Sequence, residues 1–253
     1  MGAPVTPPMT PPVTPSAIPL DRQTILVTGA AQGLGAAIAR HLAGQGARLI
    51  LMDRSAEGLA ATLDAYAGAT GTVVDLADAA DTARAIAEAV AGPVDTLIHN
   101  AAILKVEPVE AVSLASFRAT LDVGVQAAFL LTQAVWPGMR ARGGMLVFVS
   151  SRSGIEGFEG EAAYCAAKHA LEGLSKCLAL EGAPHGIASV TITPGMLMRT
   201  PMSETTYGPE QRARWVDPIR LAPAFATLAR DRPPSLSGQR LDAWQLSQQD
   251  TLP

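Results

Sequence analysis

Short runs of apolar and β-branched residues alternate along the chain with longer amphipathic segments that are rich in alanine. Short runs with both faces apolar, such as residues 146–149, are typical of strands buried on both faces of a sheet. The pattern predicts strands at 24–27, 48–52, 71–74, 96–99, 145–149 and 188–192, and helices at 34–43, 55–66, 79–90, 114–140 and 161–181. We expect the long fourth helix to break near Pro137, because proline lacks the amide hydrogen that a helix interior needs.

This order of strands and helices predicts an α/β fold of the Rossmann type, a doubly wound parallel sheet with helices on both faces. A chain of 253 residues has room for one such domain, which we place at residues 21–253. In open sheets of this kind, ligands bind outside the carboxyl ends of the strands. The chemistry is therefore expected in the loops that follow the first, fourth, fifth and sixth strands.

Two segments depart from the regular alternation. Seven of the 19 prolines fall within residues 1–20, which predicts an extended or disordered tail there. This tail lacks the basic start and apolar core of a secretory signal. Residues 196–218 combine methionines, aromatic residues and prolines, and this composition indicates a mobile lid or substrate loop more than a core element.

Composition narrows the classes of function. Hydrophobic residues make up 48% of the chain and charged residues 17%, as in a globular enzyme. A net charge of −4 gives no basic footprint, so we expect neither nucleic acid nor an anionic membrane as a partner. We see no apolar run of about 18 residues and expect no transmembrane helix. The two cysteines lie twelve residues apart in one predicted helix, so we expect reduced thiols and a cytoplasmic protein.

A glycine-rich turn follows the first predicted strand and contains Gly29, Gln32, Gly33, Leu34 and Gly35. Glycines let a backbone turn approach a pyrophosphate, and the N-terminus of the following helix favours its negative charge. Taken alone, the cluster fits an ordinary strand-to-helix turn equally well, and its G-x-x-x-G-x-G spacing differs from the common G-x-G-x-x-G form.

Asp53, eighteen residues beyond Gly35, strengthens the case for a cofactor. A carboxylate at the end of the second strand accepts hydrogen bonds from the ribose hydroxyls and repels a 2′-phosphate, which favours NAD over NADP even with Arg54 beside it. Asp75 and Leu76 follow the third strand and are also predicted to bind the cofactor. Asp75 either accepts a hydrogen bond from the adenine amino group or only caps the next turn.

Tyr164 and Lys168 are spaced i, i+4 and therefore share one face of a predicted helix. Such a pair is usually a surface contact, but it also has a specific chemical use. A phenol has a pKa near 10, so a phenolic base working near pH 7 needs about 4 kcal/mol of stabilisation of its charged form. A lysine and a positively charged nicotinamide ring can supply this in a partly dry site.

Further motifs accompany these residues in a fixed order. The motifs are the glycine turn, Asp53, Asn100-Ala101-Ala102, Ser151 thirteen residues before Tyr164, Tyr-x-x-x-Lys, and Pro194-Gly195. Over residues 23–244 this ordered set resembles the short-chain dehydrogenase/reductase family of oxidoreductases.

The resemblance implies a role for each of these groups. Tyr164 is the expected general acid/base and Ser151 the group that orients the same substrate oxygen, whereas Lys168 lowers the pKa of Tyr164 and binds the nicotinamide ribose. Like the glycine turn, Asn100, Pro194 and Gly195 are expected to bind the cofactor. The resemblance also implies a homodimer or homotetramer that packs through the helices at 114–140 and 162–181.

One position departs from the family pattern in a way that bears on catalysis. Gly124 stands 27 residues before Ser151, where the family usually has an asparagine that helps hold a proton-relay water. A water, Gln126 or Asp122 is a candidate substitute, and loss of the group is expected to slow turnover about 10²-fold if the relay matters. At the end of the chain, Trp244 either plugs the substrate end of a neighbouring subunit or completes the core.

The substrate and any metal are less clearly indicated. Carboxylates at Glu156, Glu159 and Glu161 either attract a cationic or polyhydroxylated substrate or belong to a solvated loop. The methionines of residues 196–202 favour a hydrophobic or aromatic secondary alcohol. The histidines lack metal-ligand spacing, so no metal site is expected, and His99 is expected only to pack beside the cofactor turn.

The sequence therefore predicts an NAD-dependent oxidoreductase that transfers a hydride between NAD(H) and a small secondary alcohol or ketone. Its alternative is a weak or inactive NAD-binding regulatory or scaffold protein of the same fold, which Gly124 motivates. Racemase or dehydratase chemistry on the same fold is a third hypothesis.

Overall fold

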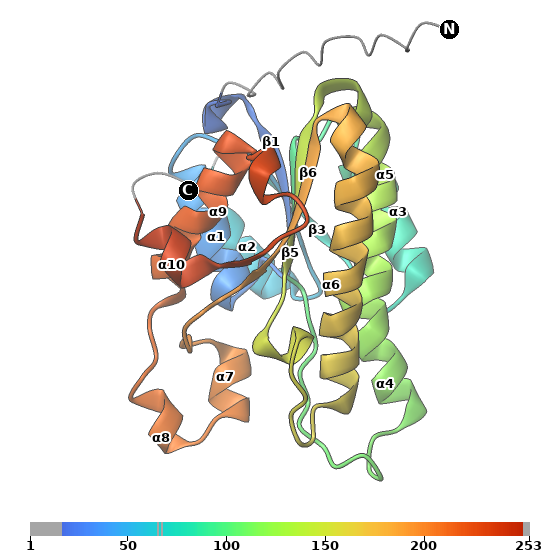
Figure 1. The fold of residues 1–253 in the computed structure, drawn as a ribbon, viewed down its shortest axis with the longest axis vertical. Coiled ribbons are helices and arrows are strands. Elements are labelled where there is room, and N and C mark those ends of the chain that lie inside the picture. Colours follow the sequence, from blue (N-terminus) through green and yellow to red (C-terminus); the bar gives the residue numbers. More distant parts are fainter. Residues whose placement is uncertain (1–16, 65, 67, 250–253) are drawn as a thin grey trace, which may run out of the picture.

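The computed structural model describes residues 17–64, 66 and 68–249 and has a seven-stranded sheet at its centre (Figure 1). The strand order is β3-β2-β1-β4-β5-β6-β7, and all neighbouring strands run parallel. The strands are β1 (Thr24–Thr28), β2 (Arg48–Asp53), β3 (Ala69–Val73), β4 (Thr96–His99), β5 (Gly144–Val149), β6 (Ile187–Thr193) and β7 (Arg240–Asp242). The predicted doubly wound parallel sheet is confirmed.

Helices cover both faces of the sheet (Figure 1). One face carries α1 (Gly33–Ala43), α2 (Ala56–Leu63), α9 (Ala222–Asp231) and α10 (Ala243–Ser247). The other carries α3 (Ala79–Ala89), α4 (Leu114–Leu121), α5 (Ala127–Arg142) and α6 (Ala162–Gly182). Each face has its own apolar core, so the central strands β1, β4, β5 and β6 are buried on both sides, as their apolar runs predict, whereas the edge strand β3 is partly exposed.

The break predicted near Pro137 is wrong. Pro137 lies inside α5, and the irregularity lies earlier, in a π-helical turn (Asp122–Gln126) between α4 and α5. Pro137 and Gln133, four residues before it, are both exposed. The Gln133 carbonyl that loses its helical partner can therefore be hydrated, which reduces the cost of the proline.

The helical stretch Leu114–Arg142 also corrects the expectation that the chain has no apolar segment long enough to cross a membrane. By length and composition it could cross a membrane, with a mean hydropathy of 1.3 in its most apolar window, of which 33% is buried. Its buried side explains part of this composition, because Leu131, Val135 and Met139 pack against the sheet.

Part of the predicted tail belongs to the folded structure. The Ile18 amide donates a hydrogen bond to the Arg230 carbonyl at 2.9 Å, and Leu20 is buried in the core. The folded part therefore begins before residue 21, because these apolar side chains pack against α9. Residues 1–16 of the predicted tail lie outside the described residues.

The segment predicted as a lid leaves the sheet after β6 and returns before α9 (Figure 1). It contains the short helices α7 (Pro201–Thr206) and α8 (Pro209–Arg212). At its base, Met198 and Val216 form a parallel β-bridge. The segment thus forms a separate, partly helical unit beside the carboxyl ends of the strands; its predicted mobility stays a prediction.

Candidate active site

A cavity of about 1100 Å³ opens at the carboxyl ends of the strands, between the sheet and the lid segment. Most of the predicted site residues line it: Gly29, Gln32, Gly33, Leu34, Asp53, Asp75, Leu76, Asn100, Ser151, Tyr164, Lys168, Pro194 and Gly195. Single pockets for drug-sized ligands reach about 1000 Å³, so this cavity has room for a larger ligand such as a dinucleotide with a small substrate. The sequence motifs, which lie far apart along the chain, therefore converge on one cavity.

Gly35 is the one predicted site residue that does not line the cavity. A Cβ atom on Gly35 would overlap the carbonyl oxygen of Gly29. Gly29 itself adopts φ +66°, a left-handed conformation that favours glycine. Gly35 therefore supports the glycine turn from behind, while Gly33 and Leu34 in the first turn of α1 line the cavity, where helix N-terminal amides favour a phosphate group.

Asn100 and Thr28 hold the glycine turn in place. The Asn100 Nδ2 amide donates hydrogen bonds to the Thr28 and Gly29 carbonyls at 3.2 and 3.1 Å. The Thr28 hydroxyl accepts from the Asn100 and Ala101 amides, each at 3.1 Å, and is paired with His99 Nδ1 at 3.1 Å. Asn100 thus fixes the backbone of the turn.

His99 is a buried core residue with two partners. Its Nε2 atom donates to the Val123 carbonyl at 3.1 Å, so Nδ1 accepts from the Thr28 hydroxyl. Burial lowers the pKa of His99 to about 3, and the nearby Lys168 ammonium acts in the same direction. The ring is therefore neutral near pH 7, and the interpretation of His99 as a packing residue is the one that the structure supports.

Asp53 lies at the end of β2 with both carboxylate oxygens engaged. Oδ2 accepts from the Ala31 amide and Oδ1 from the Ser55 amide, each at 3.0 Å. These bonds orient the carboxylate on the wall of the cavity, which Arg54 also lines. A carboxylate oxygen has more than one lone pair, so both can still accept from ribose hydroxyls.

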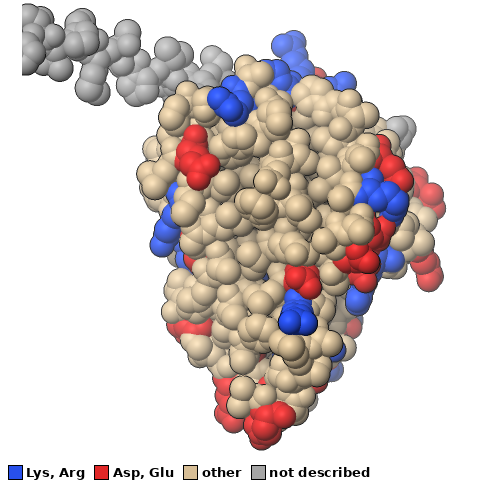
Figure 2. All heavy atoms as spheres, turned by 90° about the vertical axis from the view of Figure 1, so that its right-hand side faces the viewer, with Lys and Arg blue, Asp and Glu red and all other residues tan. Residues whose placement is uncertain are grey.

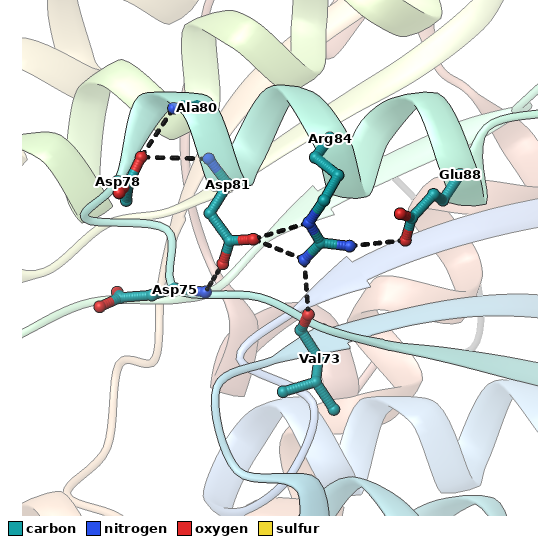
Figure 3. Close-up of polar contacts among 7 residues, drawn as sticks. All are labelled: Val73, Asp75, Asp78, Ala80, Asp81, Arg84 and Glu88. Carbon is teal, nitrogen blue, oxygen red and sulfur yellow. Dashed lines mark hydrogen bonds and ion pairs between the residues drawn. The ribbon is translucent and has the colours of Figure 1, made fainter.

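A network of side chains shapes the loop after β3 (Figure 3). The Asp75 amide donates to Asp81 at 2.8 Å, and the Asp75 carboxylate accepts from the Ala77 amide at 3.0 Å. Arg84 forks between Asp81 and Glu88, while Asp78 caps the N-terminus of α3 (Figure 3). Asp75 therefore does cap its own turn, and it also lines the cavity where the adenine is expected.

Tyr164 and Lys168 lie on the first turns of α6 and face the cavity. The Lys168 Nζ atom donates to the Val149 carbonyl at 2.6 Å and lies 5.4 Å from the centre of the Tyr164 ring. Burial lowers the pKa of Lys168 to about 8, partly opposed by the Glu172 carboxylate. Burial raises the pKa of Tyr164, and a hydrogen bond with Ser151 only partly opposes this. The protein's own groups thus keep Tyr164 in its phenol form.

Sequence reasoning missed a buried network beneath Ser151. Glu172 accepts from the Ser150 hydroxyl at 2.5 Å, from the Thr191 hydroxyl at 2.7 Å and from Arg240 Nε at 3.2 Å. Arg240 Nη2 also donates to the Ser151 carbonyl at 3.0 Å. The i+4 spacing from Lys168 to Glu172 was a signal for this carboxylate, whereas nothing local indicated Arg240. The network joins α6, β5, β6 and β7 directly below the predicted catalytic groups.

Among the described residues, the neighbourhood of Gly124 holds no side chain that replaces the missing asparagine. Neither Asp122 nor Gln126 lines the cavity. Gly124 is buried, and a Cβ atom there would lie 3.1 Å from the Cβ atom of Ala167. The two candidate side chains from the sequence are therefore not placed to substitute.

The three carboxylates of the loop before α6 have different surroundings. Glu156 is paired with Arg152 at 2.6 Å on the surface, and Glu159 is exposed. Glu161, by contrast, lines the cavity and is only 9% exposed. Its Oε2 atom accepts a hydrogen bond from the Ser153 hydroxyl at 2.8 Å. The solvated-loop interpretation thus holds for two of the three residues.

The lid segment supplies the opposite wall. Met196, Met198, Met202 and Tyr207 line the cavity from this side, as the methionine pattern predicts for a substrate wall. Trp244 packs against the core, and the guanidinium carbon of Arg220 lies 4.4 Å from the centre of the Trp244 ring. This packing supports the interpretation that Trp244 completes the core. Among residues 17–64, 66 and 68–249, no group of three His, Cys, Asp or Glu side chains is arranged to hold a metal ion.

Comparison with known proteins identifies the family. The family model described as short chain dehydrogenase matches residues 23–211. D-threitol dehydrogenase of Mycolicibacterium smegmatis is 37% identical over 238 residues, which cover 88% of this chain and 91% of that protein.

Solved structures agree with this match. The 3-ketoacyl-(acyl-carrier-protein) reductase of Brucella melitensis complexed with NADH gives a TM-score of 0.82 at 28% identity, with 88% of this chain and 97% of that one covered. A variant of actinorhodin polyketide ketoreductase with NADPH gives 0.78 at 28% identity, with 88% and 96% covered. The fold, the site and these relatives show that the chain belongs to the short chain dehydrogenase family of oxidoreductases.

Proposed function

We propose that this protein interconverts a small secondary alcohol and its ketone with NAD(H) as cofactor. The observation that carries the proposal is the meeting of Ser151, Tyr164 and Lys168 in one cavity with the glycine turn and Asp53. When bound, the nicotinamide supplies or accepts the hydride. The protein's part is to hold the two reactants in line and to move the proton.

Tyr164 is the proposed proton carrier to and from the substrate oxygen. In the alcohol-oxidising direction it takes the carbinol proton, and in the reducing direction it returns a proton to the ketone oxygen. The Ser151 hydroxyl, which lines the same cavity, is proposed to orient the same oxygen. Since burial raises the pKa of Tyr164, positive charge from Lys168 and the bound nicotinamide ring has to offset that effect in the working complex.

Lys168 is held in a position from which it can serve this purpose. One of its three N–H groups donates to the Val149 carbonyl, which leaves two for the ribose of the cofactor and for the neighbourhood of Tyr164. Glu172 lies one turn further along α6 and raises the pKa of Lys168, which favours its charged form. The proposed role of Lys168 thus depends on the network below it.

NAD is the proposed cofactor. Asp53 lines the cavity at the end of β2 and is proposed to accept from the ribose hydroxyls, where its negative charge would repel a 2′-phosphate. In Asp53→Ala we expect the ratio of kcat/KM with NADP to that with NAD to rise by about tenfold or more. An unchanged ratio would show that Asp53 does not select the cofactor.

The substrate is proposed to be polar. The name of the relative D-threitol dehydrogenase gives D-threitol, which is polyhydroxylated. In this cavity, Glu161, Ser153 and Tyr207 supply polar groups beside the methionines. These observations favour the polyhydroxylated alternative over a hydrophobic alcohol.

The test of the whole proposal is an assay of NADH absorbance with a panel of ketones and secondary alcohols, including butan-2-ol and butane-2,3-diol. We expect turnover with NAD and at least one alcohol. Micromolar NADH binding without turnover of any compound would favour the alternative of a regulatory or scaffold protein. Epimerised or dehydrated products without net NADH change would favour the racemase or dehydratase hypothesis.

We further propose a homodimer or homotetramer in the cytoplasm, with a small molecule as partner and neither nucleic acid nor membrane. Figure 2 looks onto the side that carries α4, α5 and α6, where a broad area has no charged side chains. Phe129 on α5 and Leu180 on α6 are 45% and 79% exposed. A second copy would cover these side chains. Light scattering should give a multiple of the chain mass, and Leu180→Glu should lower it.

A further inference from the structure

Glu161 places a buried carboxylate on the wall of the cavity. Among the described residues it forms no ion pair, and the Ser153 hydroxyl, at 2.8 Å, is the one group that donates to its side chain. The two oxygens of an ionised carboxylate together offer about four acceptor sites. Most of the acceptor capacity of Glu161 is therefore not used by the described part of the protein.

The burial of Glu161 is not explained by a structural task in the helix that follows. Glu161 is the N-cap residue of α6, yet its side chain accepts no hydrogen bond from the amides of that helix. Removing a carboxylate from water costs free energy that a cap or an ion pair would offset. Carboxylates in such surroundings are concentrated at functional sites, so a ligand of the cavity is a candidate partner for Glu161.

The backbone around Glu161 is fixed by hydrogen bonds. The Glu161 amide donates to the Phe158 carbonyl at 3.2 Å, and the Glu161 carbonyl accepts from the Cys165 amide at 2.8 Å. The carbonyl of the preceding Gly160 accepts from the Glu107 amide at 2.9 Å. A side chain on a backbone that is already ordered loses less freedom when a ligand binds, which favours binding. Glu161 is thus a preorganised acceptor.

Glu161 lies close to the proposed proton carrier. It precedes Tyr164 by three residues, so the two groups stand about one helical turn apart at the start of α6. Both line the cavity, as does Tyr207 of the lid segment. In agreement with this placement, the negative charge of Glu161 raises the pKa of both tyrosines. A substrate whose reacting oxygen lies at Tyr164 can therefore reach Glu161 with a group on the next carbon.

The chemistry of a carboxylate selects the kind of group that it binds. An ionised carboxylate only accepts hydrogen bonds, so the ligand has to donate one, as a hydroxyl or an ammonium does. The Lys168 ammonium lies 5.4 Å from the centre of the Tyr164 ring, and a bound oxidised nicotinamide adds further positive charge. These charges repel a second cation beside the reacting oxygen, whereas a neutral hydroxyl meets no such repulsion.

We propose that Glu161, held in place by Ser153, binds a second hydroxyl of the substrate and makes the enzyme selective for vicinal diols over simple secondary alcohols. This inference rests on the proposed alcohol–ketone activity and assigns its choice of substrate to one residue. Tyr164 exchanges a proton with one oxygen, while the hydroxyl on the next carbon donates to Glu161 and stays unreacted. Ser153 is a positioning residue, because it touches the carboxylate and not the reacting atoms.

The test compares three alcohols that differ at one carbon. Butane-2,3-diol has the second hydroxyl, butan-2-ol lacks it, and 3-methoxybutan-2-ol keeps the second oxygen without a hydrogen to donate. The diol preference is the ratio of kcat/KM with butane-2,3-diol to kcat/KM with butan-2-ol. Dissociation constants of the same alcohols from the complex of protein and NADH, followed by NADH fluorescence, give this comparison without turnover.

Four variants separate the role of Glu161 from that of its loop. Glu161→Leu removes both acceptor oxygens at a similar size, and Glu161→Gln keeps one acceptor oxygen without the charge. Ser153→Ala removes the hydroxyl that holds the carboxylate. Glu159→Leu changes an exposed carboxylate of the same loop and is the matched control.

We expect the wild type to prefer the diol about tenfold to a hundredfold, the effect of one hydrogen bond to a charged group. The methoxy compound should show no such preference. Glu161→Leu should lose most of the diol preference, Glu161→Gln and Ser153→Ala should keep part of it, and Glu159→Leu should equal the wild type. A merely structural role would lower kcat/KM with both alcohols alike and leave the ratio unchanged.

Other results would overturn the proposal. A diol preference that survives in Glu161→Leu would remove Glu161 from substrate selection. Equal use of the diol and the methoxy compound would show that the second hydroxyl donates to no carboxylate. Tighter binding of 3-aminobutan-2-ol than of the diol, lost in Glu161→Leu, would make this an ammonium site.

Failure of the proposed activity is distinguishable from failure of this inference. If the wild type turns over no alcohol or ketone, the proposed activity fails, and the dissociation constants still decide whether Glu161 binds the second hydroxyl. Turnover of butan-2-ol and butane-2,3-diol at equal kcat/KM would leave the activity standing and remove the inference.

Discussion

The two halves of the cavity are formed by different kinds of chemical group. On the side of β1, β2 and β4, the backbone of the glycine turn forms a central part of the wall, and Asn100 fixes its carbonyls by hydrogen bonds. On the side of β5, β6 and β7, long charged side chains carry the structure, and the buried pair of Glu172 and Arg240 supports Ser151 from below. The lid segment adds a further wall, which reaches the glycine turn where Thr200 lies against Gly33.

This difference indicates which kind of change should disturb each half of the cavity most. A wall of backbone depends on steric room, so the smallest added atom disturbs it. A wall of charged and hydroxylic side chains depends on protonation, so pH and charge-removing substitutions disturb it. Changes on the two sides should therefore separate cofactor binding from turnover.

The largest expected effect is on the substrate side. Tyr164→Phe removes the proposed proton carrier while it leaves the ring in place. Turnover should fall by about 10²- to 10⁴-fold, and NADH affinity should stay close to that of the wild type. Steady-state kinetics and NADH fluorescence titration measure the two quantities. Equal losses of both would mean that the halves do not separate in this way.

Glu172→Gln probes the buried pair. The variant leaves Arg240 without its charged partner and should cost about 3 kcal/mol of stability, the low end for a buried pair because Arg240 is partly exposed. Glu172 raises the pKa of Lys168, so its neutralisation should bring that pKa below the present value of about 8. If protonated Lys168 is needed, the alkaline fall of kcat/KM should move to lower pH. A pH–rate profile measures the shift, and an unmoved alkaline limb would exclude the coupling.

Gly35→Ala probes the backbone side. The added Cβ atom would overlap the Gly29 carbonyl oxygen, which is backbone and cannot rotate away. We expect a loss of about 1–3 kcal/mol of stability together with weaker NADH binding. Gly92→Ala is the matched control, because a Cβ atom there meets no atom within 4 Å. Normal NADH affinity in the Gly35 variant would show that the turn tolerates displacement.

His99 joins the two halves, since it contacts Thr28 on the cofactor side and Val123 in the π-helical turn. Its pKa is about 3 in the folded protein, against 6.5 for the free side chain. Below pH 6.5 the unfolded chain therefore binds a proton that folded His99 does not, and stability is lost as the pH falls. From pH 7 to pH 5 this residue should account for about 2 kcal/mol of lost unfolding free energy. Urea unfolding of the wild type and of His99→Asn at both values measures it; an equal loss in both would assign the effect to other groups.

The accuracy of the sequence predictions follows the same division. Local patterns placed all six predicted strands and the glycine turn, because buried parallel strands and tight turns restrict residue type at neighbouring positions. The π-helical turn at Asp122–Gln126 was not predictable from Pro137, because the break depends on how α4 and α5 pack against α6. Arg240 and Glu172 are 68 residues apart, so no local pattern linked them. The three loop carboxylates looked alike in sequence, and burial alone distinguished Glu161 from its neighbours.

The close approach of Gly124 to Ala167 has a consequence for redesign. An asparagine grafted onto position 124 would bring its Cβ atom to 3.1 Å from that of Ala167, so one of the two helical segments has to yield by a few tenths of an ångström. Ala167 directly precedes Lys168, whose ammonium is fixed to the Val149 carbonyl. The steric strain of an asparagine at position 124 would therefore displace Lys168, the residue that the asparagine was meant to assist. Positions 124 and 167 behave as one steric unit, and an engineered amide at the first calls for a glycine at the second.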